Sequence, residues 1–300
     1  MSDKEPTGTA LNELAKRLHH HVWTLAGEIG EHNVFHPEAL LAAQSYITET
    51  WRSQGFEVAE QLFQVEGVRC ANLEVTLPGT EQPEAIILIG AHYDSVIGAP
   101  GANDNGSGVA ALLEISRLMG AERLPCTFRF VAFANEEMPF FNTGDQGAVR
   151  YAQAARRRGD DIRLMLCLET IGYYRDEPGS QDYPALFRFF YPNRGNFLAL
   201  VSNFRSRQMM LRLVKQFRAS SDFPLEHVAT SPMVPGVAWS DHAAFWREGY
   251  PAVMATDTAF YRYPYYHTAQ DLPDKLQYGA FARVTEGLFR ALVSLAKTGG

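Results

Sequence analysis

The chain has 300 residues, of which 46% are hydrophobic, 20% charged and 12% aromatic, a composition typical of globular enzymes and unlike that of disordered or fibrous chains. Its 27 basic and 34 acidic residues give a net charge of −7, and no sustained basic block is present to neutralise phosphates. We therefore expect no nucleic-acid partner. The length fits one large α/β domain, and we predict a single domain over residues 1–300.

The sequence shows neither a secretory signal nor a membrane-spanning segment. No apolar run follows a basic stretch near the start, and no run approaches the roughly 18 to 20 apolar residues that span a bilayer. We expect a cytoplasmic protein without a membrane partner. The three cysteines, Cys70, Cys126 and Cys167, show no CxxC spacing and are expected to be core thiols.

Two helices are predicted in the N-terminal part of the chain, within residues 11–55. Apolar residues recur at helical spacing over residues 11–26 and again over residues 37–55. Pro37 suits the first turn of the second helix and Gly55 suits its end.

Strands and helices alternate through the rest of the chain. Residues 57–65 and 71–77 half-alternate like strands, and residues 85–91 form a continuous apolar run typical of a buried strand. The elements predicted beyond this run are, in order, a helix at 109–119, a strand at 127–134, a helix at 148–158, strands at 162–168 and 197–202, helices at 207–219 and 241–247, a strand at 252–256 and a helix at 278–297. This alternation predicts an α/β fold, a three-layer sandwich in which helices cover both faces of a mixed, mostly parallel sheet.

Imidazole and carboxylate side chains follow three of the predicted strands. His92 and Asp94 come after residues 85–91, the pair Glu136-Glu137 follows the strand at 127–134, and Glu169 ends the strand at 162–168. Because ligands bind beyond the carboxyl ends of strands in an open parallel sheet, we expect these side chains to share one rim.

Two further residues are expected to complete the cluster. Asp104 lies in the glycine-rich segment 101–108, whose flexible backbone can return the carboxylate to the rim, and His267 ends an aromatic stretch, residues 260–266. Crowded carboxylates repel one another unless a cation neutralises them, and His, Asp and Glu together suit zinc or a similar divalent ion.

Other motifs have simpler interpretations. The glycine-rich segment matches neither GxGxxG nor GxxxxGK[ST], so a phosphate site is disfavoured. Ser107 lacks a GxSxG context and is interpreted as a helix N-cap. The run of three histidines at 19–21 is expected to form a partly exposed helix face rather than a metal site.

Together these motifs are similar to those of the co-catalytic zinc exopeptidases, a family that includes bacterial leucine aminopeptidases and glutamate carboxypeptidase. The similarity extends over residues 86–276, and the family's phosphorylase/hydrolase-like fold is the one it implies. The motifs that carry it are His92-x-Asp94, Asp104 with Asn105-Gly106-Ser107-Gly108, Glu136-Glu137, Glu169, Ser240-Asp241-His242 and Tyr266-His267-Thr268.

The resemblance implies two bound zinc ions. Asp104 bridges them, with His92 and Glu169 on one ion and with Glu137 and His267 on the other.

The resemblance also implies roles for neighbouring residues. Glu136 is expected to be the general base, and Asp94 to orient the ring of His92. Tyr266 matches a position that in some relatives donates a hydrogen bond to the developing oxyanion. The peptide bond between Asp104 and Asn105 is expected to be cis.

The expected activity is that of an aminopeptidase acting on peptides through a zinc-activated water. Residues 139–143 and 260–266 are expected to wall an apolar pocket, which favours hydrophobic N-terminal residues. Most aminopeptidases of the family carry Asp where this chain has Glu169. Two alternatives therefore stay open, a single-zinc glutaminyl-peptide cyclotransferase and a catalytically inactive, peptidase-like binding domain.

Overall fold

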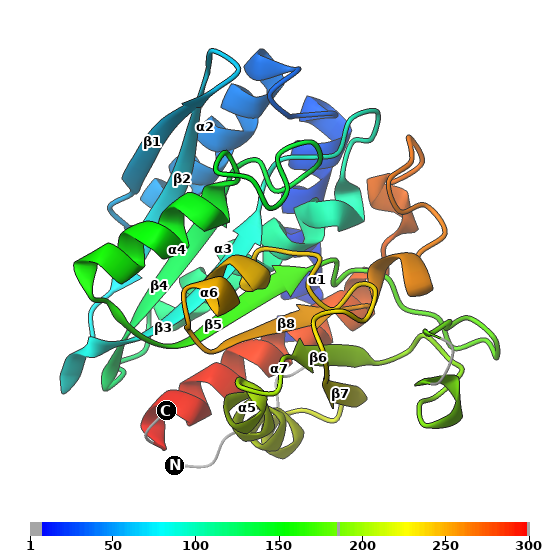
Figure 1. The fold of residues 1–300 in the computed structure, drawn as a ribbon. Helices are drawn as coiled ribbons and strands as arrows, with labels where there is room; N and C mark the ends of the chain where they lie inside the picture. The colour runs from blue at the N-terminus through cyan, green and yellow to red at the C-terminus, as the bar shows by residue number, and fades with distance from the viewer. Residues whose placement is uncertain (1–7, 185–186, 299–300) are drawn as a thin grey trace.

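The computed structural model describes residues 8–184 and 187–298, and its centre is an eight-stranded sheet (Figure 1). The strands are β1 (Ala59–Val65), β2 (Val68–Leu77), β3 (Gln82–His92), β4 (Cys126–Phe133), β5 (Asp161–Glu169), β6 (Leu198–Ser202), β7 (Leu225–Ala229) and β8 (Ala252–Thr256), in the spatial order β1-β2-β4-β3-β5-β8-β6-β7. Strands β4, β3, β5 and β8 run parallel, whereas β2 and β6 pair antiparallel with β4 and β8. The predicted mixed, mostly parallel sheet is confirmed.

Helices cover both faces of this sheet and make three layers (Figure 1). One face carries α1 (Gly8–Val22), α2 (Pro37–Ser53), α3 (Gly108–Met119), α5 (Arg207–Ser220) and α7 (Tyr278–Lys297), and the other carries α4 (Gly147–Arg158) and α6 (His242–Arg247). Helix α1 continues into a π-helical segment, Trp23–Ile29, and a second π-helical segment, Ala102–Ser107, precedes α3.

The central strands are buried on both faces. In β3, Ile87 and Ile89 pack in the larger core with α3 and α7, while Ile86 and Leu88 pack in the smaller core with α4. A strand buried on both faces needs apolar side chains at every position, which explains the uninterrupted apolar run in the sequence.

Two local expectations need correction and one is confirmed. Strand β7 has no predicted counterpart. The face of histidines at 19–21 is partly exposed, as predicted, with His21 buried between Tyr46 Oη, at 2.7 Å from Nδ1, and Glu114 Oε1, at 3.2 Å from Nε2. Ser107 occupies the N-cap position of α3 without capping it; its hydroxyl donates to the Asn103 carbonyl instead.

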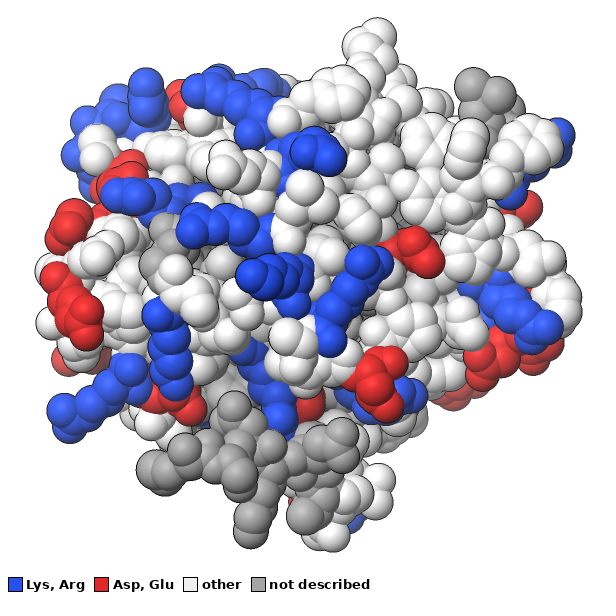
Figure 2. Space-filling model, turned by 90° about the horizontal axis from the view of Figure 1, so that it is seen from below, with Lys and Arg blue, Asp and Glu red and all other residues white. Residues whose placement is uncertain are grey.

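The three cysteines are buried and unpaired, as predicted. Among the described residues, no helix is both long and apolar enough to cross a membrane. Lys and Arg side chains gather over much of the face seen from below, although the chain as a whole is acidic (Figure 2).

Candidate metal centre

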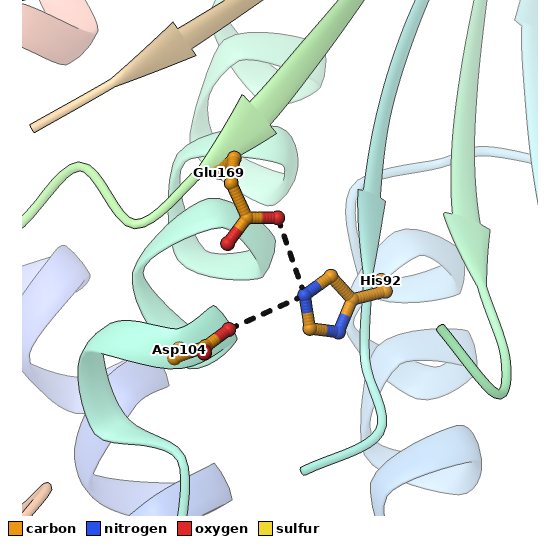
Figure 3. Close-up of side chains that lie close together, drawn as sticks. All are labelled: His92, Asp104 and Glu169. Carbon is orange, nitrogen blue, oxygen red and sulfur yellow. Dashed lines mark ion pairs between the residues drawn. The ribbon is translucent and has the colours of Figure 1, made fainter. Parts of the chain in front are cut away.

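Three of the predicted ligands converge where β3 and β5 end (Figure 3). His92 is the last residue of β3, and its Nε2 lies 3.4 Å from Asp104 Oδ1 and 3.3 Å from Glu169 Oε2. Glu169 ends β5, the next strand in the sheet, so the parallel pairing brings both side chains to one rim. All three residues are buried.

A second group of ligands shares Asp104 with the first. Oδ2 of Asp104 lies 3.0 Å from His267 Nε2, and the same nitrogen is 3.5 Å from Glu137 Oε2. His267 comes from the chain after β8 and adopts a left-handed backbone, with φ at 57°. The structure thus brings together all five residues that the sequence singles out as ligands.

Glu136 lies beside the first group, with Oε2 at 3.9 Å from His92 Nε2. Burial raises the pKa of Glu136 well above its usual value, although the nearby His92 opposes this rise. Burial, reinforced by Asp104, likewise raises the pKa of Glu137. A cation bound at such carboxyls displaces their protons.

Asp94 supports the short loop that carries both glutamates. Its Oδ1 accepts the backbone N–H of Glu136 at 2.9 Å, and its Oδ2 accepts that of Glu137 at 3.0 Å. The contact with His92 runs through the backbone, because Nδ1 of that ring lies 3.1 Å from the Asp94 carbonyl oxygen and 3.7 Å from the carboxylate. A fixed Nδ1 leaves Nε2 directed into the cluster.

A distant carboxylate holds the loop that carries Asp104 by accepting hydrogen bonds from it. Asp271 accepts the backbone N–H groups of Asn103 at 2.8 Å and of Asp104 at 3.1 Å, and it also accepts the hydroxyl of Tyr263 at 2.7 Å. The peptide bond from Asp104 to Asn105 is cis, as the resemblance implies.

Two residues for which the sequence predicted no role support the cluster. Ser240 donates its hydroxyl to Glu169 Oε2 at 2.6 Å. Asp257 directly follows β8 and accepts the side-chain N–H of Asn103 at 2.9 Å, next to the Asp104 loop. The rule that located the other carboxylates at strand ends also applies to Asp257, so the signal was present.

An apolar cavity of about 840 Å³, its open mouth included, adjoins the cluster. Glu169 and Tyr266 line the end nearest to the ligands, and the ring of Tyr266 stacks on His267 with centroids 3.9 Å apart. Residues 260–266 contribute one wall, as expected, but none of residues 139–143 lines the cavity. Phe140 packs instead on Phe35 in the N-terminal part of the chain. The other walls come from Tyr183, Pro184, Phe187 and Tyr191 and from residues 234–239.

The donor set fits a divalent metal. The close approaches of both imidazoles to Asp104 are not hydrogen bonds, and Asp104 Oδ2 and Glu137 Oε1 are buried without a hydrogen-bond partner among the described residues. Buried carboxylate oxygens lacking a proton donor are costly unless they coordinate a cation. Mixed imidazole and carboxylate ligands suit zinc.

Comparison with known sequences decides the family, because peptidase family M28 matches residues 72–292. The chain belongs to peptidase family M28. It is a zinc metallopeptidase, and its relatives include proteins named as a probable zinc metalloprotease and a probable leucine aminopeptidase. It is 36% identical to the uncharacterized protein YfbL of Escherichia coli K12 over 256 residues, covering 82% of this chain and 78% of YfbL. It spans less than half the length of several probable fungal zinc metalloproteases that it also matches.

Solved structures share the fold of this chain. The zinc aminopeptidase BSAP from Bacillus subtilis superposes with a TM-score of 0.73 at 14% identity, covering 93% of this chain and 94% of BSAP. The glutaminyl cyclase of Fimbriiglobus ruber superposes with a TM-score of 0.70 at 17% identity, covering 99% and 98%. At these identities the likeness establishes the shared fold.

Proposed function

We propose that the chain is a two-zinc aminopeptidase that removes N-terminal residues from peptides. The position of Asp104 between the two imidazoles carries this proposal, since one of its oxygens approaches His92 and the other approaches His267. Each imidazole also has a carboxylate of its own, Glu169 for His92 and Glu137 for His267. A carboxylate shared between two such sets is suited to bridge two ions.

These five residues would hold the two ions, with Asp104 common to both. Bound zinc supplies Lewis-acid chemistry, which polarises a carbonyl oxygen and lowers the pKa of a nearby water molecule.

Glu136 is the proposed general base. It takes a proton from the attacking water and returns it to the departing amine. Because burial raises the pKa of this carboxyl, it holds a proton more readily than an exposed glutamate does. Asp94 fixes the backbone on which Glu136 stands, so the carboxylate keeps its place while its protonation changes.

Tyr266 is the proposed oxyanion donor. Burial, reinforced by Asp104, raises the pKa of its hydroxyl far above the usual value, so the hydroxyl stays protonated at neutral pH. Stacking on His267 holds the ring beside the ligands. The hydroxyl can then donate a hydrogen bond to the substrate carbonyl as negative charge develops on its oxygen.

Metal analysis combined with a substrate panel tests this function. Purified protein should contain two zinc ions per chain and hydrolyse aminoacyl p-nitroanilides with a free α-amine, while N-acetylated counterparts remain intact. Cleavage of the blocked substrates at comparable rates contradicts an aminopeptidase. Release of free amino acids from the C-terminus of peptides indicates a carboxypeptidase instead.

A glutaminyl-peptide cyclotransferase is the second candidate. The similarity in fold to the cyclase of Fimbriiglobus ruber favours it. The family resemblance also implies that Glu169 departs from the Asp that most aminopeptidases of the family carry. This candidate predicts about one zinc ion per chain and conversion of N-terminal glutamine to pyroglutamate without release of amino acids. Metal analysis and identification of the product, carried out on the same preparation, separate the two activities.

A further inference from the structure

The floor of the apolar cavity is a row of residues that crosses four strands. Glu169 on β5 pairs with Thr256 on β8, Thr256 pairs with Ala199 on β6, and Ala199 pairs with Glu226 on β7. All four residues line the cavity. Cross-strand partners point to the same face of a sheet, so this row ends in a carboxylate at both ends. One end is the proposed ligand Glu169, and the other is Glu226.

The carboxylate of Glu226 has no hydrogen bond or ion pair with any described residue. Two tyrosine hydroxyls that feel its charge donate their hydrogen bonds elsewhere. Tyr183 donates its hydroxyl to the Pro192 carbonyl at 2.5 Å, and Tyr191 donates to the His227 carbonyl at 3.0 Å. The guanidinium of Arg218 donates to the Leu225 carbonyl at 3.0 Å. Burial raises the pKa of the Glu226 carboxyl, and the positive charge of Arg218 opposes this rise without a hydrogen bond between them.

The surroundings of Glu226 suit a cation. The rings of Tyr183 and Tyr191 stack at the same end of the cavity, with centroids 5.8 Å apart. Burial, reinforced by the negative charge of Glu226, raises the pKa of both hydroxyls. Burial raises the pKa of the Glu226 carboxyl, as expected for a half-buried acid without a close partner. Aromatic faces and a carboxylate together attract a guanidinium or an ammonium group.

We propose that Glu226 is a specificity-determining residue that selects substrates whose N-terminal residue is arginine or lysine. The inference rests on the proposed function, because the scissile end of the substrate must lie at the ligand cluster. Neighbouring strands are about 4.8 Å apart, so the backbones of Glu169 and Glu226 are separated by about 14 Å. An extended cationic side chain lies along the apolar walls between them and places its charge at Glu226.

The test compares arginyl and citrullinyl p-nitroanilides, because citrulline keeps the length and shape of arginine without its charge. Wild-type protein should favour the arginyl substrate in kcat/KM by about 10- to 100-fold, the range expected for a hydrogen bond to a charged group. Glu226→Gln should bring the two substrates to within about threefold while leaving cleavage of leucyl p-nitroanilide unchanged. The control is Glu177→Gln, which removes an exposed carboxylate that does not line the cavity.

Each outcome decides between the claims. The inference is overturned if the preference for arginine survives Glu226→Gln, or if wild-type protein cleaves both substrates equally. In either case, cleavage of the leucyl substrate still supports the peptidase proposal. If no aminoacyl substrate is cleaved, the proposed function fails. Calorimetric titration with L-argininamide and L-citrullinamide then tests whether Glu226 binds a cation. Tighter binding of argininamide that is lost in Glu226→Gln supports the cation site, whereas equal binding of both amides overturns it.

Discussion

Glu136 and Glu137 are neighbours in sequence, yet they face different partners. Glu137 Oε2 lies 3.5 Å from His267, whereas Glu136 Oε2 lies 3.9 Å from His92, which has two closer carboxylates. Both backbone N–H groups are held by Asp94. This difference supports a ligand role for Glu137 and leaves the carboxylate of Glu136 available for proton transfer.

Replacing Glu136 with glutamine should lower kcat by roughly two to four orders of magnitude, because the amide accepts no proton from water. Zinc content should stay at the wild-type level, since the five proposed ligands are intact. Steady-state kinetics and metal analysis on the same preparation check both statements. Loss of one zinc ion together with the activity would identify Glu136 as a ligand instead.

At the level of residues, the sequence located the cluster because it sits at the ends of strands that are easily recognised. Residues that act through hydrogen bonds were harder to find. Ser240 and Asp271 contact Glu169 and the Asp104 loop across large separations in the chain. Such contacts depend on how loops fold over the rim, which neither hydrophobic periodicity nor turn chemistry specifies.

At the level of elements, α3 begins directly against β5. Gly108 is the first residue of α3, and a Cβ atom there would lie 2.3 Å from Asn105 Oδ1 and 2.6 Å from the Leu168 carbonyl oxygen. Asn105 Oδ1 accepts the backbone N–H of Thr170 at 3.1 Å. This contact between the start of α3 and β5 therefore also ties the Asp104 loop to the end of β5.

Gly108→Ala should therefore lower the free energy of unfolding by about 1–3 kcal/mol, the usual cost of overpacking. Gly279→Ala is the matched control, because that position in α7 has open space around it and alanine favours helix, with an expected gain of up to about 1 kcal/mol. Urea denaturation of both variants measures the changes. Equal stability of the two variants would show that α3 and β5 can move apart to accept the added methyl group.

Helix α6 begins with a buried imidazole. Nε2 of His242 donates to the Val237 carbonyl at 2.8 Å, and Nδ1 has no partner among the described residues. Burial lowers the pKa of His242 to about 4, against about 6.5 in an unfolded chain. The unfolded chain binds this proton at a higher pH than the folded protein does.

The stabilisation from His242 is thus fully present above pH 6.5 and is lost as the pH falls toward 4, by about 3 kcal/mol in total. His242→Gln keeps a donor for Val237 but does not titrate, so its stability should fall less over this range. Urea denaturation of metal-free protein at several pH values measures the difference. Parallel curves for wild type and variant would contradict the assignment.

Most elements were predictable because their apolar patterns are long. Strand β7 was not, since its five residues include Glu226 and His227 and show no apolar run. The cavity walls were assigned in part to residues 139–143, but Phe140 packs on Phe35. An aromatic segment next to a ligand can serve the core or the pocket, and only tertiary packing decides between them.

At the level of the whole molecule, the ligands come from segments spread along most of the chain, from His92 to His267. Metal bound only by the folded protein stabilises it by mass action. Chelation should lower the thermal midpoint, and added zinc should raise it in steps that follow the zinc concentration, by about 2.7 kcal/mol at a hundredfold excess over Kd. Calorimetric scans at several zinc concentrations check this dependence. A midpoint unchanged after verified loss of zinc would contradict it.

The hydrogen bonds of Asp271 bear on how the protein acquires its metal. They fix the Asp104 loop through backbone N–H groups, and Asp94 does the same for the two glutamates, so the protein scaffold positions these side chains itself. A site preorganised in this way exchanges ions without refolding. Since the order of affinities for divalent metals is similar across such ligand sets, the ion it carries in a cell then depends on which metals the surroundings supply.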